Sequence, residues 1–255
     1  MPRGPWWTAS GWISTRGLCE DYPSAGGPAI RTVGVSTPEG PTVKLTLVIQ
    51  AGGASSRMGT DKALLPIDGL PMAERVLKRL QHLTDDVLII SNSPERLAYL
   101  GLPVLPDVLA VRGALPGIIS ALTYARGDAV AVVACDMAFA SPEIFLAEFE
   151  LLKGGGADAV VPRTESGLEP FHAVYAREAC LPAASAAYAA GSMRADSWYG
   201  AVKITEFGPG LIAACDPLGV AFVNVNTPTE YDETVGTNES AEEARAGLCL
   251  EHDAG

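Results

Sequence analysis

The chain has 255 residues, of which 48% are hydrophobic and 19% are charged, and this supports a sizeable core in one main domain. Its net charge of −12 at pH 7 argues against non-specific nucleic-acid binding through the phosphate backbone. The five cysteines form no Cys-x-x-Cys pair, which argues against a zinc knuckle or a dithiol motif and is typical of a reducing cytoplasm.

Residues 1–43 differ in composition from the rest of the chain. They are rich in Gly, Pro, Ser and Thr, and their apolar residues have no regular period. We expect a poorly ordered N-terminal extension outside the fold. No apolar run in the sequence approaches the roughly 20 residues of a membrane span, and the N-terminus lacks the apolar stretch of a secretory signal. We therefore expect no membrane association and a cytoplasmic location.

From Lys44 onward, strand-like and helix-like stretches alternate. Helices are predicted over Pro71–Leu83 and Leu115–Ala125, and Ser141-Pro142-Glu143 has the N-cap, proline and acid that open another. The predicted strands, all rich in apolar residues, are Lys44–Gln50, Asp86–Ser91, Leu102–Leu105, Ala129–Ala134, Asp158–Val161, Phe171–Tyr175 and Ala221–Val225. This alternation predicts a Rossmann-like α/β fold, a three-layer α/β/α arrangement around a mainly parallel sheet. Residues 236–255 form an acidic C-terminal tail.

The most informative segment follows the first predicted strand. It reads Leu47-Val48-Ile49-Gln50-Ala51-Gly52-Gly53-Ala54-Ser55-Ser56-Arg57-Met58-Gly59-Thr60-Asp61-Lys62. The paired glycines allow a sharp turn and a close approach of a ligand to the backbone N–H groups. Arg57 and Lys62 add two positive charges that suit a polyphosphate. The loop matches neither the Walker A pattern nor Gly-x-Gly-x-x-Gly. The alternative is a glycine-rich turn with solvated charges.

The order Gly-Gly, Arg-Met-Gly and Asp-Lys resembles the signature loop of nucleotidyltransferases, and most closely that of the molybdenum cofactor guanylyltransferase family. The resemblance covers about residues 44–235, which implies one nucleotidyltransferase domain. It implies that Gln50, Ala51, Gly52, Gly53 and Lys62 bind the nucleotide, and that Arg57 and Lys62 act in catalysis. Gln50 stands where a Leu is common, next to the base pocket of that fold, so its amide could alter the base preference.

Cys135-Asp136-Met137-Ala138 follows the predicted strand Ala129–Ala134. A carboxylate at the carboxyl end of a strand can hold Mg²⁺ beside bound phosphates, and the alternative is an Asp that caps a turn. The family motif reads Cys-Asp-Met-Pro, which implies that Asp136 is a catalytic residue that binds Mg²⁺ and nucleotide.

The segment Phe222-Val223-Asn224-Val225-Asn226-Thr227-Pro228 resembles the family motif Asn-Val-Asn-Thr-Pro. Alternation along a strand would place Asn224 and Asn226 on the same side. The resemblance implies that both face the acceptor and that Asn226 also faces the metal. The alternative, which is compatible with this role, is that the segment starts a helix with Thr227 as the N-cap.

Weaker matches support the same assignment. Asn92 and Asp107 end the second and third predicted strands, and by resemblance they contact the nucleotide, although each alone would pass as a turn former. Arg194 resembles an Arg near the pterin acceptor, and the alternative is a solvated helix Arg. Gly113-Ala114-Leu115-Pro116-Gly117-Ile118 resembles a family segment at a helix N-terminus, where glycines let a ligand approach.

The resemblance implies Mg²⁺-dependent transfer of GMP from GTP to the phosphate of molybdopterin, with release of pyrophosphate. Molybdoenzyme-maturation proteins are further candidate partners. One alternative is a related enzyme that uses CTP or another phosphorylated acceptor. Another, of a different class, is a nucleotide-binding regulator without turnover.

Overall fold

The structure is a computed structural model that describes residues 43–52, 62–67 and 69–236. The chain divides into two units, residues 1–40 and 41–255. The first unit lies wholly outside the described residues, and the second contains the whole fold that follows. The predicted extension 1–43 and tail 236–255 therefore lie outside the described residues, apart from Val43 and Gly236.

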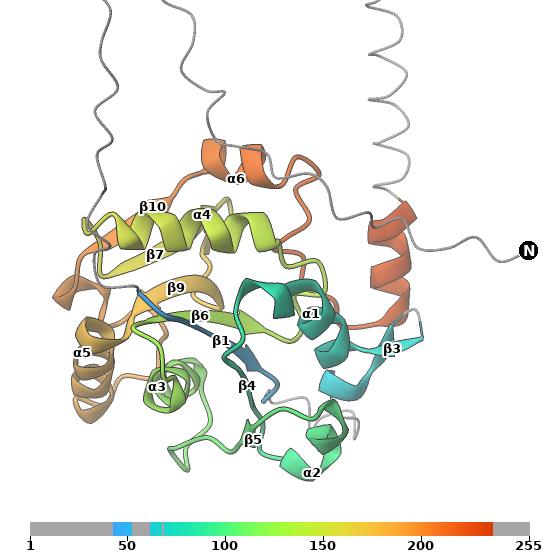
Figure 1. The fold of residues 1–255 in the computed structure, drawn as a ribbon, viewed down its shortest axis with the longest axis horizontal. Coiled ribbons are helices and arrows are strands. Elements are labelled where there is room, and N and C mark those ends of the chain that lie inside the picture. The colour runs from blue at the N-terminus through green and yellow to red at the C-terminus, as the bar shows by residue number, and fades with distance from the viewer. Residues whose placement is uncertain (1–42, 53–61, 68, 237–255) are drawn as a thin grey trace, which may run out of the picture. The chain divides into compact units, whose positions relative to one another are not determined.

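One sheet forms the centre of the second unit, with the strand order β10-β7-β9-β6-β1-β4-β5 (Figure 1). Strand β9 is antiparallel to both of its neighbours, whereas the other pairs in this order are parallel, so the sheet is mainly parallel as predicted. A short strand, β8, pairs with β7 at the side. The strands are β1 (Leu45–Gln50), β4 (Val87–Ile90), β5 (Val104–Leu105), β6 (Ala129–Ala134), β7 (Ala159–Thr164), β8 (Gly167–Leu168), β9 (His172–Ala176) and β10 (Ile204–Phe207).

Strand β1 lies in the middle of the sheet because its residues suit burial on both faces. All six are buried, and they pair in parallel with β4 on one side and β6 on the other. Such continuous apolar runs are expected where helices cover both faces of a parallel sheet.

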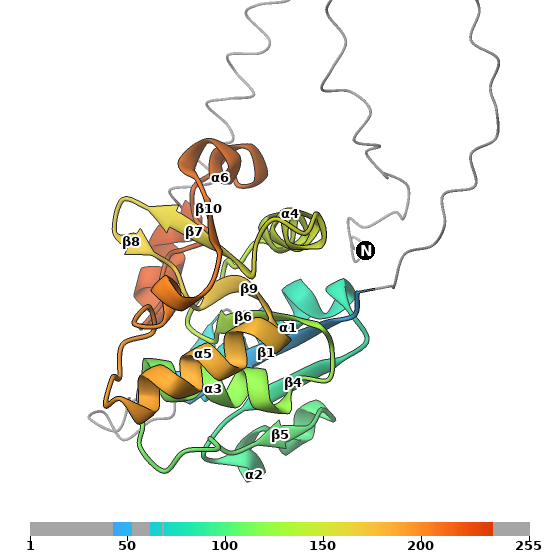
Figure 2. The same ribbon diagram turned by 90° about the vertical axis from the view of Figure 1, so that its left-hand side faces the viewer.

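Helices cover the two faces and complete the three layers predicted from the sequence (Figures 1 and 2). Helices α1 (Met72–Leu80), α4 (Pro142–Lys153) and α6 (Pro209–Cys215) pack on one face, and α3 (Ala114–Tyr124) and α5 (Arg177–Ala189) pack on the other. A short helix, α2 (Pro94–Leu97), lies beside β5. No helix in the described part of the chain is long and apolar enough to cross a membrane.

Two predicted helices agree closely with the structure. The segment predicted as Pro71–Leu83 contains α1 and a final 3₁₀ turn, and Met72, Val76 and Leu80 are buried on one face. Helix α4 begins at Pro142, where the Ser141 side chain accepts a hydrogen bond from the Ile144 N–H. This is the expected N-cap. Helices α5 and α6 and strand β10 were not predicted.

The predicted strand Ala221–Val225 is wrong, because this segment consists of turns and irregular backbone. Its backbone donors are bound by groups outside any ladder. The Asp216 carboxylate accepts from Gly219 N (3.2 Å) and from Ala221 N (2.7 Å), and Val223 N donates to Val220 O (2.9 Å). The apolar composition therefore reflects burial against the domain, not pairing in the sheet.

The end of the described chain is helical over residues 228–236 and packs in a third apolar cluster. Tyr231 stacks on Phe139 with ring centroids 4.9 Å apart and an interplanar angle of 7°. The cluster also contains Ile67, from the hairpin formed by β2 (Pro66–Ile67) and β3 (Leu70–Pro71), and Val225. It holds the C-terminal segment against the loop that follows β6.

Candidate functional site

Four neighbouring parallel strands end at one edge of the sheet. Their order is β6-β1-β4-β5, and the residues after them are Asp136, Ala51-Gly52, Asn92 and Asp107 respectively. The carboxyl ends of parallel strands are where open α/β sheets bind ligands. The structure therefore brings these sequence-predicted residues to the edge where a ligand is expected.

Asn92 and Asp107 are joined by two hydrogen bonds. Asn92 Nδ2 donates to Asp107 Oδ2 (2.8 Å), and Asp107 N donates to Asn92 Oδ1 (3.3 Å). Ser120, in α3, has its hydroxyl 3.2 Å from the other carboxylate oxygen and 2.8 Å from Pro116 O, two acceptors for one hydrogen, and it accepts from Val108 N at 3.0 Å. A Cβ atom at Gly52 would lie 3.8 Å from both Asn92 Nδ2 and Asp107 Oδ2, so the glycine backbone borders this cluster. The cluster forms a polar wall beside the end of β1.

Gln50, the last residue of β1, turns its side chain toward the first turn of α3. It is 7% exposed, and its Nε2 donates to Gly117 O at 2.6 Å. A Cβ at residue 117 would lie 3.5 Å from Oε1, so glycine allows helix and amide to approach closely. The carbonyl of Gly117 fixes the donor end of the amide through one of its two N–H groups, which leaves Oε1 as the acceptor end.

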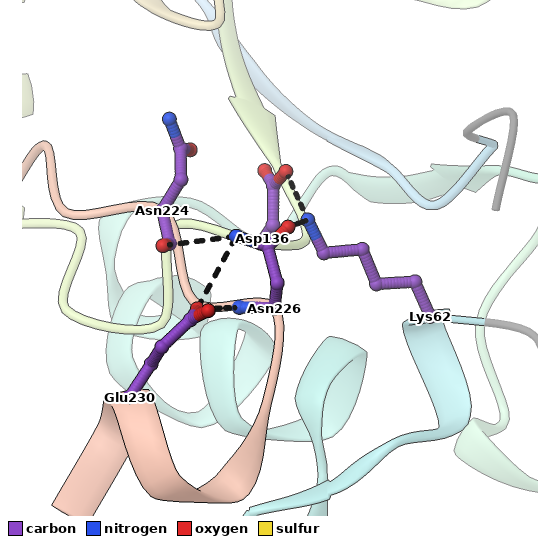
Figure 3. A network of polar contacts seen from close by, with 5 residues as sticks. All are labelled: Lys62, Asp136, Asn224, Asn226 and Glu230. Carbon is purple, nitrogen blue, oxygen red and sulfur yellow. Dashed lines mark hydrogen bonds and ion pairs between the residues drawn. The ribbon is translucent and has the colours of Figure 1, made fainter. Parts of the chain in front are cut away.

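Lys62 joins two segments that are distant in sequence (Figure 3). Its Nζ lies 2.7 Å from Asp136 Oδ2 and 2.6 Å from Asn226 Oδ1. The side chains of Lys62 and Asp136 are 20% and 28% exposed, so the ion pair is partly buried. Partial burial makes such a pair stronger than a fully solvated one. Val225 N donates to Asp136 O at 2.8 Å, which brings the Asn226 segment to the end of β6.

Glu230 extends this network on the far side of Asn226 (Figure 3). Its Oε2 accepts from Asn226 N at 2.6 Å and from Asn226 Nδ2 at 3.2 Å. The Asn226 backbone N–H lowers the pKa of Glu230, with a further contribution from the Asn226 side chain. Thr227 is the N-cap of the helix at residues 228–236, since its Oγ1 accepts from Glu230 N at 3.2 Å.

The site can hold both a cation and a polyphosphate. Asp136 and Asn226 direct one oxygen each to a single point, where an ammonium group lies, and a carboxylate with an amide carbonyl is a hard-oxygen set that suits Mg²⁺. The described residues contain no group of three or more His, Cys, Asp and Glu side chains placed to hold a metal. A Mg²⁺ ion here would accordingly share its coordination between these oxygens, phosphate and water.

Some predicted residues lie elsewhere or outside the described part of the chain. Gly53 and Arg57 lie outside the described residues. Asn224 contributes its backbone oxygen, which is 3.5 Å from Asn226 Nδ2, while its own amide takes no part in the contacts drawn in Figure 3. Because the segment is not a strand, strand alternation does not apply to the two asparagines, and their assignment to the acceptor stays a proposal.

Arg194 lies on a turn next to the N-terminal end of α3, where Leu115 N donates to Met193 O. Its side chain is 80% exposed and forms two hydrogen bonds with Asp196, at 3.0 and 2.8 Å. The Asp196 carboxylate raises the pKa of Arg194. Arg194 forms none of the contacts of the Lys62 network in Figure 3, and its predicted role at the acceptor remains a proposal.

Two residues of the site were missed by sequence reasoning. Ser120 gives no local signal, because its partners Asp107 and Val108 lie in a different part of the chain. Glu230 has a signal, since Thr227-Pro228-Thr229-Glu230 fits the Ser/Thr-x-x-Glu capping box. That pattern identifies a helix start, but it does not show that the acid also holds Asn226.

A buried pair lies behind the Asp136 loop. His172 and Glu148 are both fully buried, with His172 Nδ1 3.8 Å from Glu148 Oε1. His172 Nε2 accepts from Ser141 N at 3.3 Å, which indicates a neutral ring protonated on Nδ1. Burial lowers the pKa of His172 to about 3 and raises the pKa of Glu148 well above its usual value. The imidazole thus anchors the end of the loop that carries Asp136.

Comparison with known families gives a match at the level of the domain. The sequence pattern of the MobA-like NTP transferase domain matches residues 47–202. This range contains the last four residues of β1, the glycine-rich loop, Lys62 and Asp136 but ends before Asn226.

Individual relatives match over most of their length. The chain is 37% identical over 205 residues to a probable molybdenum cofactor guanylyltransferase of Pelotomaculum thermopropionicum, which covers 80% of this chain and 97% of the relative. It is 33% identical over 195 residues to a molybdenum cofactor guanylyltransferase of Desulfosudis oleivorans, with 74% of this chain and 93% of the relative covered.

Among solved structures, the fold is similar to molybdopterin-guanine dinucleotide biosynthesis protein A from Archaeoglobus fulgidus. The TM-score is 0.64 at 21% identity, and the match covers 78% of this chain and 99% of that one. At this identity the comparison supports the nucleotidyltransferase-like α/β fold and nothing finer.

Proposed function

The chain belongs to the MobA-like NTP transferase family and is a nucleotidyltransferase, and from that premise we propose that it transfers GMP from GTP to the phosphate of molybdopterin. Pyrophosphate is the second product. The names of the relatives support the donor and the acceptor. The residues assigned to the reaction are supported by their arrangement at the end of β6 and β1.

The observation that carries the proposal is the convergence of Lys62, Asp136 and Asn226. One ammonium lies within 2.7 Å of a carboxylate oxygen and an amide oxygen at the sheet edge where the glycine-rich loop begins. A site for phosphoryl-type transfer needs both positive charge for phosphate oxygens and oxygen ligands for a cation. This arrangement offers the positive charge of Lys62 and the oxygens of Asp136 and Asn226 at one place.

In the proposed reaction, the phosphate of the acceptor attacks the α-phosphorus of GTP in line, and the bond to the leaving pyrophosphate breaks. The protein supplies position and charge, because an anionic phosphate needs no general base to become a nucleophile. Lys62, Arg57 and the backbone N–H groups of the β1 loop would bind the phosphate oxygens that gain charge. Asn224, Asn226 and Arg194 are assigned to the acceptor side.

Nucleotidyltransferases of this family use a divalent metal ion, and we assign Mg²⁺ to Asp136 and Asn226. Bound there, Mg²⁺ would polarise phosphate oxygens as a Lewis acid. Lys62 would then turn its ammonium to the phosphates.

Gln50, Asn92 and Asp107 form the proposed wall of the nucleoside pocket. We assign Oε1 of Gln50 as the acceptor for a donor on the base, because Nε2 donates to Gly117 O. The Asn92–Asp107 pair borders Gly52, where the sugar or the first phosphate would pass.

We propose a cytoplasmic location because the described cysteines Cys135, Cys180 and Cys215 are free thiols, as expected in a reducing compartment. Molybdoenzyme-maturation proteins, which would receive the product, are proposed as further partners.

The test is pyrophosphate release by the full-length protein with each of GTP, ATP, CTP and UTP, with and without molybdopterin. We expect release with GTP only when molybdopterin is present, and formation of the guanine dinucleotide. A preference for CTP over GTP in direct competition would identify the protein as a cytidylyltransferase. Binding of GTP without release under any condition would favour a regulator that lacks turnover.

A further inference from the structure

The side-chain amide of Asn226 has an acceptor, Oδ1, and a donor, Nδ2, which contact different partners. Its Oδ1 lies 2.6 Å from Lys62 Nζ, on the side of Asp136, and its Nδ2 lies 3.2 Å from Glu230 Oε2 on the opposite side (Figure 3). An amide that rotates by half a turn exchanges its acceptor for its donor. Only one of the two orientations offers an oxygen to a cation.

Glu230 distinguishes these orientations. A carboxylate accepts hydrogen bonds and donates none, so it attracts Nδ2 and repels Oδ1. The same oxygen, Oε2, also accepts from the Asn226 backbone N–H at 2.6 Å, which fixes the carboxylate relative to the residue that it orients. The reversed amide would face two unfavourable contacts, oxygen against Glu230 and NH₂ against the Lys62 ammonium.

We propose that Glu230 is a positioning residue that keeps the Asn226 amide oxygen directed at the point shared with Asp136. This proposal rests on the proposed function, in which that oxygen binds the metal. It adds a residue that touches neither metal nor substrate but decides what Asn226 offers them.

The competing explanation is that Glu230 is only part of a helix cap. It stands at the third position of the helix whose N-cap is Thr227, as in a capping box. The two explanations separate because a cap needs only an acceptor at residue 230, which Gln also supplies. A positioning role needs a group that accepts and cannot donate, because a group that can do both tolerates either orientation of the Asn226 amide.

Glu230→Gln provides the test, because Gln retains the length and one acceptor for the cap but adds an NH₂ group that can meet Asn226 in either orientation. The matched control is Thr227→Ala, which removes the cap oxygen and leaves the Glu230 contacts with Asn226 in place. Mn²⁺ binding is measured by electron paramagnetic resonance with a non-hydrolysable GTP analogue, together with the thermal midpoint.

We expect Glu230→Gln to weaken Mn²⁺ binding by roughly tenfold, the lower end for loss of an orienting partner, with little change in the thermal midpoint. Thr227→Ala should show the reverse, a midpoint lower by about 2–4 °C and normal Mn²⁺ binding. If Glu230→Gln lowers the midpoint as Thr227→Ala does and leaves Mn²⁺ binding unchanged, Glu230 is a cap and the proposal is wrong.

A double variant supplies the rescue. In Asn226→Asp with Glu230→Gln, the Gln NH₂ can donate to one Asp oxygen while the other faces the metal, so Mn²⁺ binding should recover most of the loss. Asn226→Asp alone places two carboxylates side by side and should not recover it. Failure of the double variant to bind Mn²⁺ better than Glu230→Gln would contradict the orienting role.

The side-chain amide signal of Asn226 separates this proposal from the proposed function. In ¹⁵N NMR spectra, Glu230→Gln should shift the Asn226 NH₂ signal, and Thr227→Ala should leave it near its wild-type position. If the wild-type protein binds no Mn²⁺ with nucleotide but this pattern holds, the metal assignment fails and the orienting contact stands. An unshifted signal in Glu230→Gln would overturn the positioning role.

Discussion

The two halves of the candidate site are held in place by different means. Gln50 ends one of four adjacent parallel strands, and Asn92, Asp107 and Asp136 lie within two residues of the ends of the others, so the hydrogen-bond ladder of the sheet fixes where their backbone begins. Asn226 and its neighbours lie on a segment outside the sheet. The first half is positioned by the fold as a whole, and the second by a small set of polar and apolar side-chain contacts.

The second half depends on contacts that single substitutions can remove. Asp216 accepts two backbone hydrogen bonds at the start of the segment, Glu230 accepts two from Asn226, and Tyr231 stacks on Phe139. We infer that substitutions in the sheet-borne half change chemistry at an intact backbone. Substitutions in the C-terminal half change the placement of Asn226 as well.

The largest effect is expected where the halves meet. Asp136→Asn should reduce turnover by a factor of at least about 100, because the amide keeps the size of the side chain but loses the charge that binds Mg²⁺ and pairs with Lys62. The measurement is kcat for pyrophosphate release at limiting Mg²⁺.

Asp85→Asn is the matched control, since Asp85 is exposed at the amino end of β4, away from the site. It should retain normal turnover. Near-normal turnover in a folded Asp136→Asn protein would reject the metal assignment.

The next largest effect is expected at Lys62, whose ammonium group contacts both halves of the site. Lys62→Ala should lower kcat/KM by roughly 10-fold or more, since a hydrogen bond to a charged group contributes about 1.5–3 kcal/mol. Arg57→Ala is expected to act similarly. The loss should be the same for every accepted triphosphate, because phosphates carry no base identity.

Lys78→Ala, which removes an exposed lysine that pairs with Glu74 on α1, is the control and should leave kcat/KM unchanged. A loss in Lys62→Ala that appeared with GTP but not with the other triphosphates would show that Lys62 reads the base.

A smaller effect is expected within the sheet-borne half alone. If Gln50 binds the base, Gln50→Leu should shift the ratio of GTP to CTP use by roughly 2- to 10-fold, the range for loss of one neutral hydrogen bond of about 0.5–1.5 kcal/mol. The physical reason is the loss of Oε1 as an acceptor for the base. Direct competition between the two triphosphates measures it, and an unchanged ratio would mean that Gln50 only packs against α3.

The smallest effect on activity should come from the buried pair behind the Asp136 loop, where the change is in stability. Because burial raises the pKa of Glu148, the folded protein keeps a proton that the unfolded chain releases, and wild-type stability falls as the pH rises above about 4.5, the usual pKa of a Glu. Glu148→Gln removes this fall. The variant should therefore gain unfolding free energy relative to wild type as the pH rises, by up to about 1.4 kcal/mol per pH unit.

Urea unfolding at pH 5.5, 7.0 and 8.5 measures the difference, with the exposed Glu150→Gln on the same helix as control. The contribution of His172 has the opposite sign, since its lowered pKa makes stability fall as the pH drops from about 6.5 toward 3. The His172 contribution is the same in wild type and in Glu148→Gln, so it cancels in the difference. A Glu148→Gln protein less stable than wild type at pH 8.5 would mean that the carboxylate is charged and paired.

The sequence predicts the sheet-borne half well because its signals are local. Buried strands such as β1 and β6 are continuous apolar runs, and the predicted bounds Ala129–Ala134 agree with the structure. A parallel sheet then places the residues after such strands at one edge. Helix α5 has no such signal, because it is rich in Ala, contains Pro182 and has few large apolar residues with a helical period.

The C-terminal half could not be predicted to the same degree because its contacts with the other half of the site are long-range. Ala221–Val225 has the composition of a buried strand, and an Asp five positions before Ala221 does not by itself indicate that the segment leaves the sheet. The family motif indicates Asn226 as a site residue. Asn226 and Lys62 are 164 positions apart in the sequence. Because of this separation, the motif alone does not show that Asn226 and Asp136 contact the same Lys62 ammonium.

The central place of β1 has a consequence for how the chain folds during synthesis. Among the described strands this one is made first, yet its partner β6 ends at Ala134, so one of its edges lacks that partner until Ala134 has emerged from the ribosome. β4 emerges earlier and can cover the other edge. An apolar strand with an open edge invites pairing with another chain, so the nascent protein passes through a stage that is prone to aggregation.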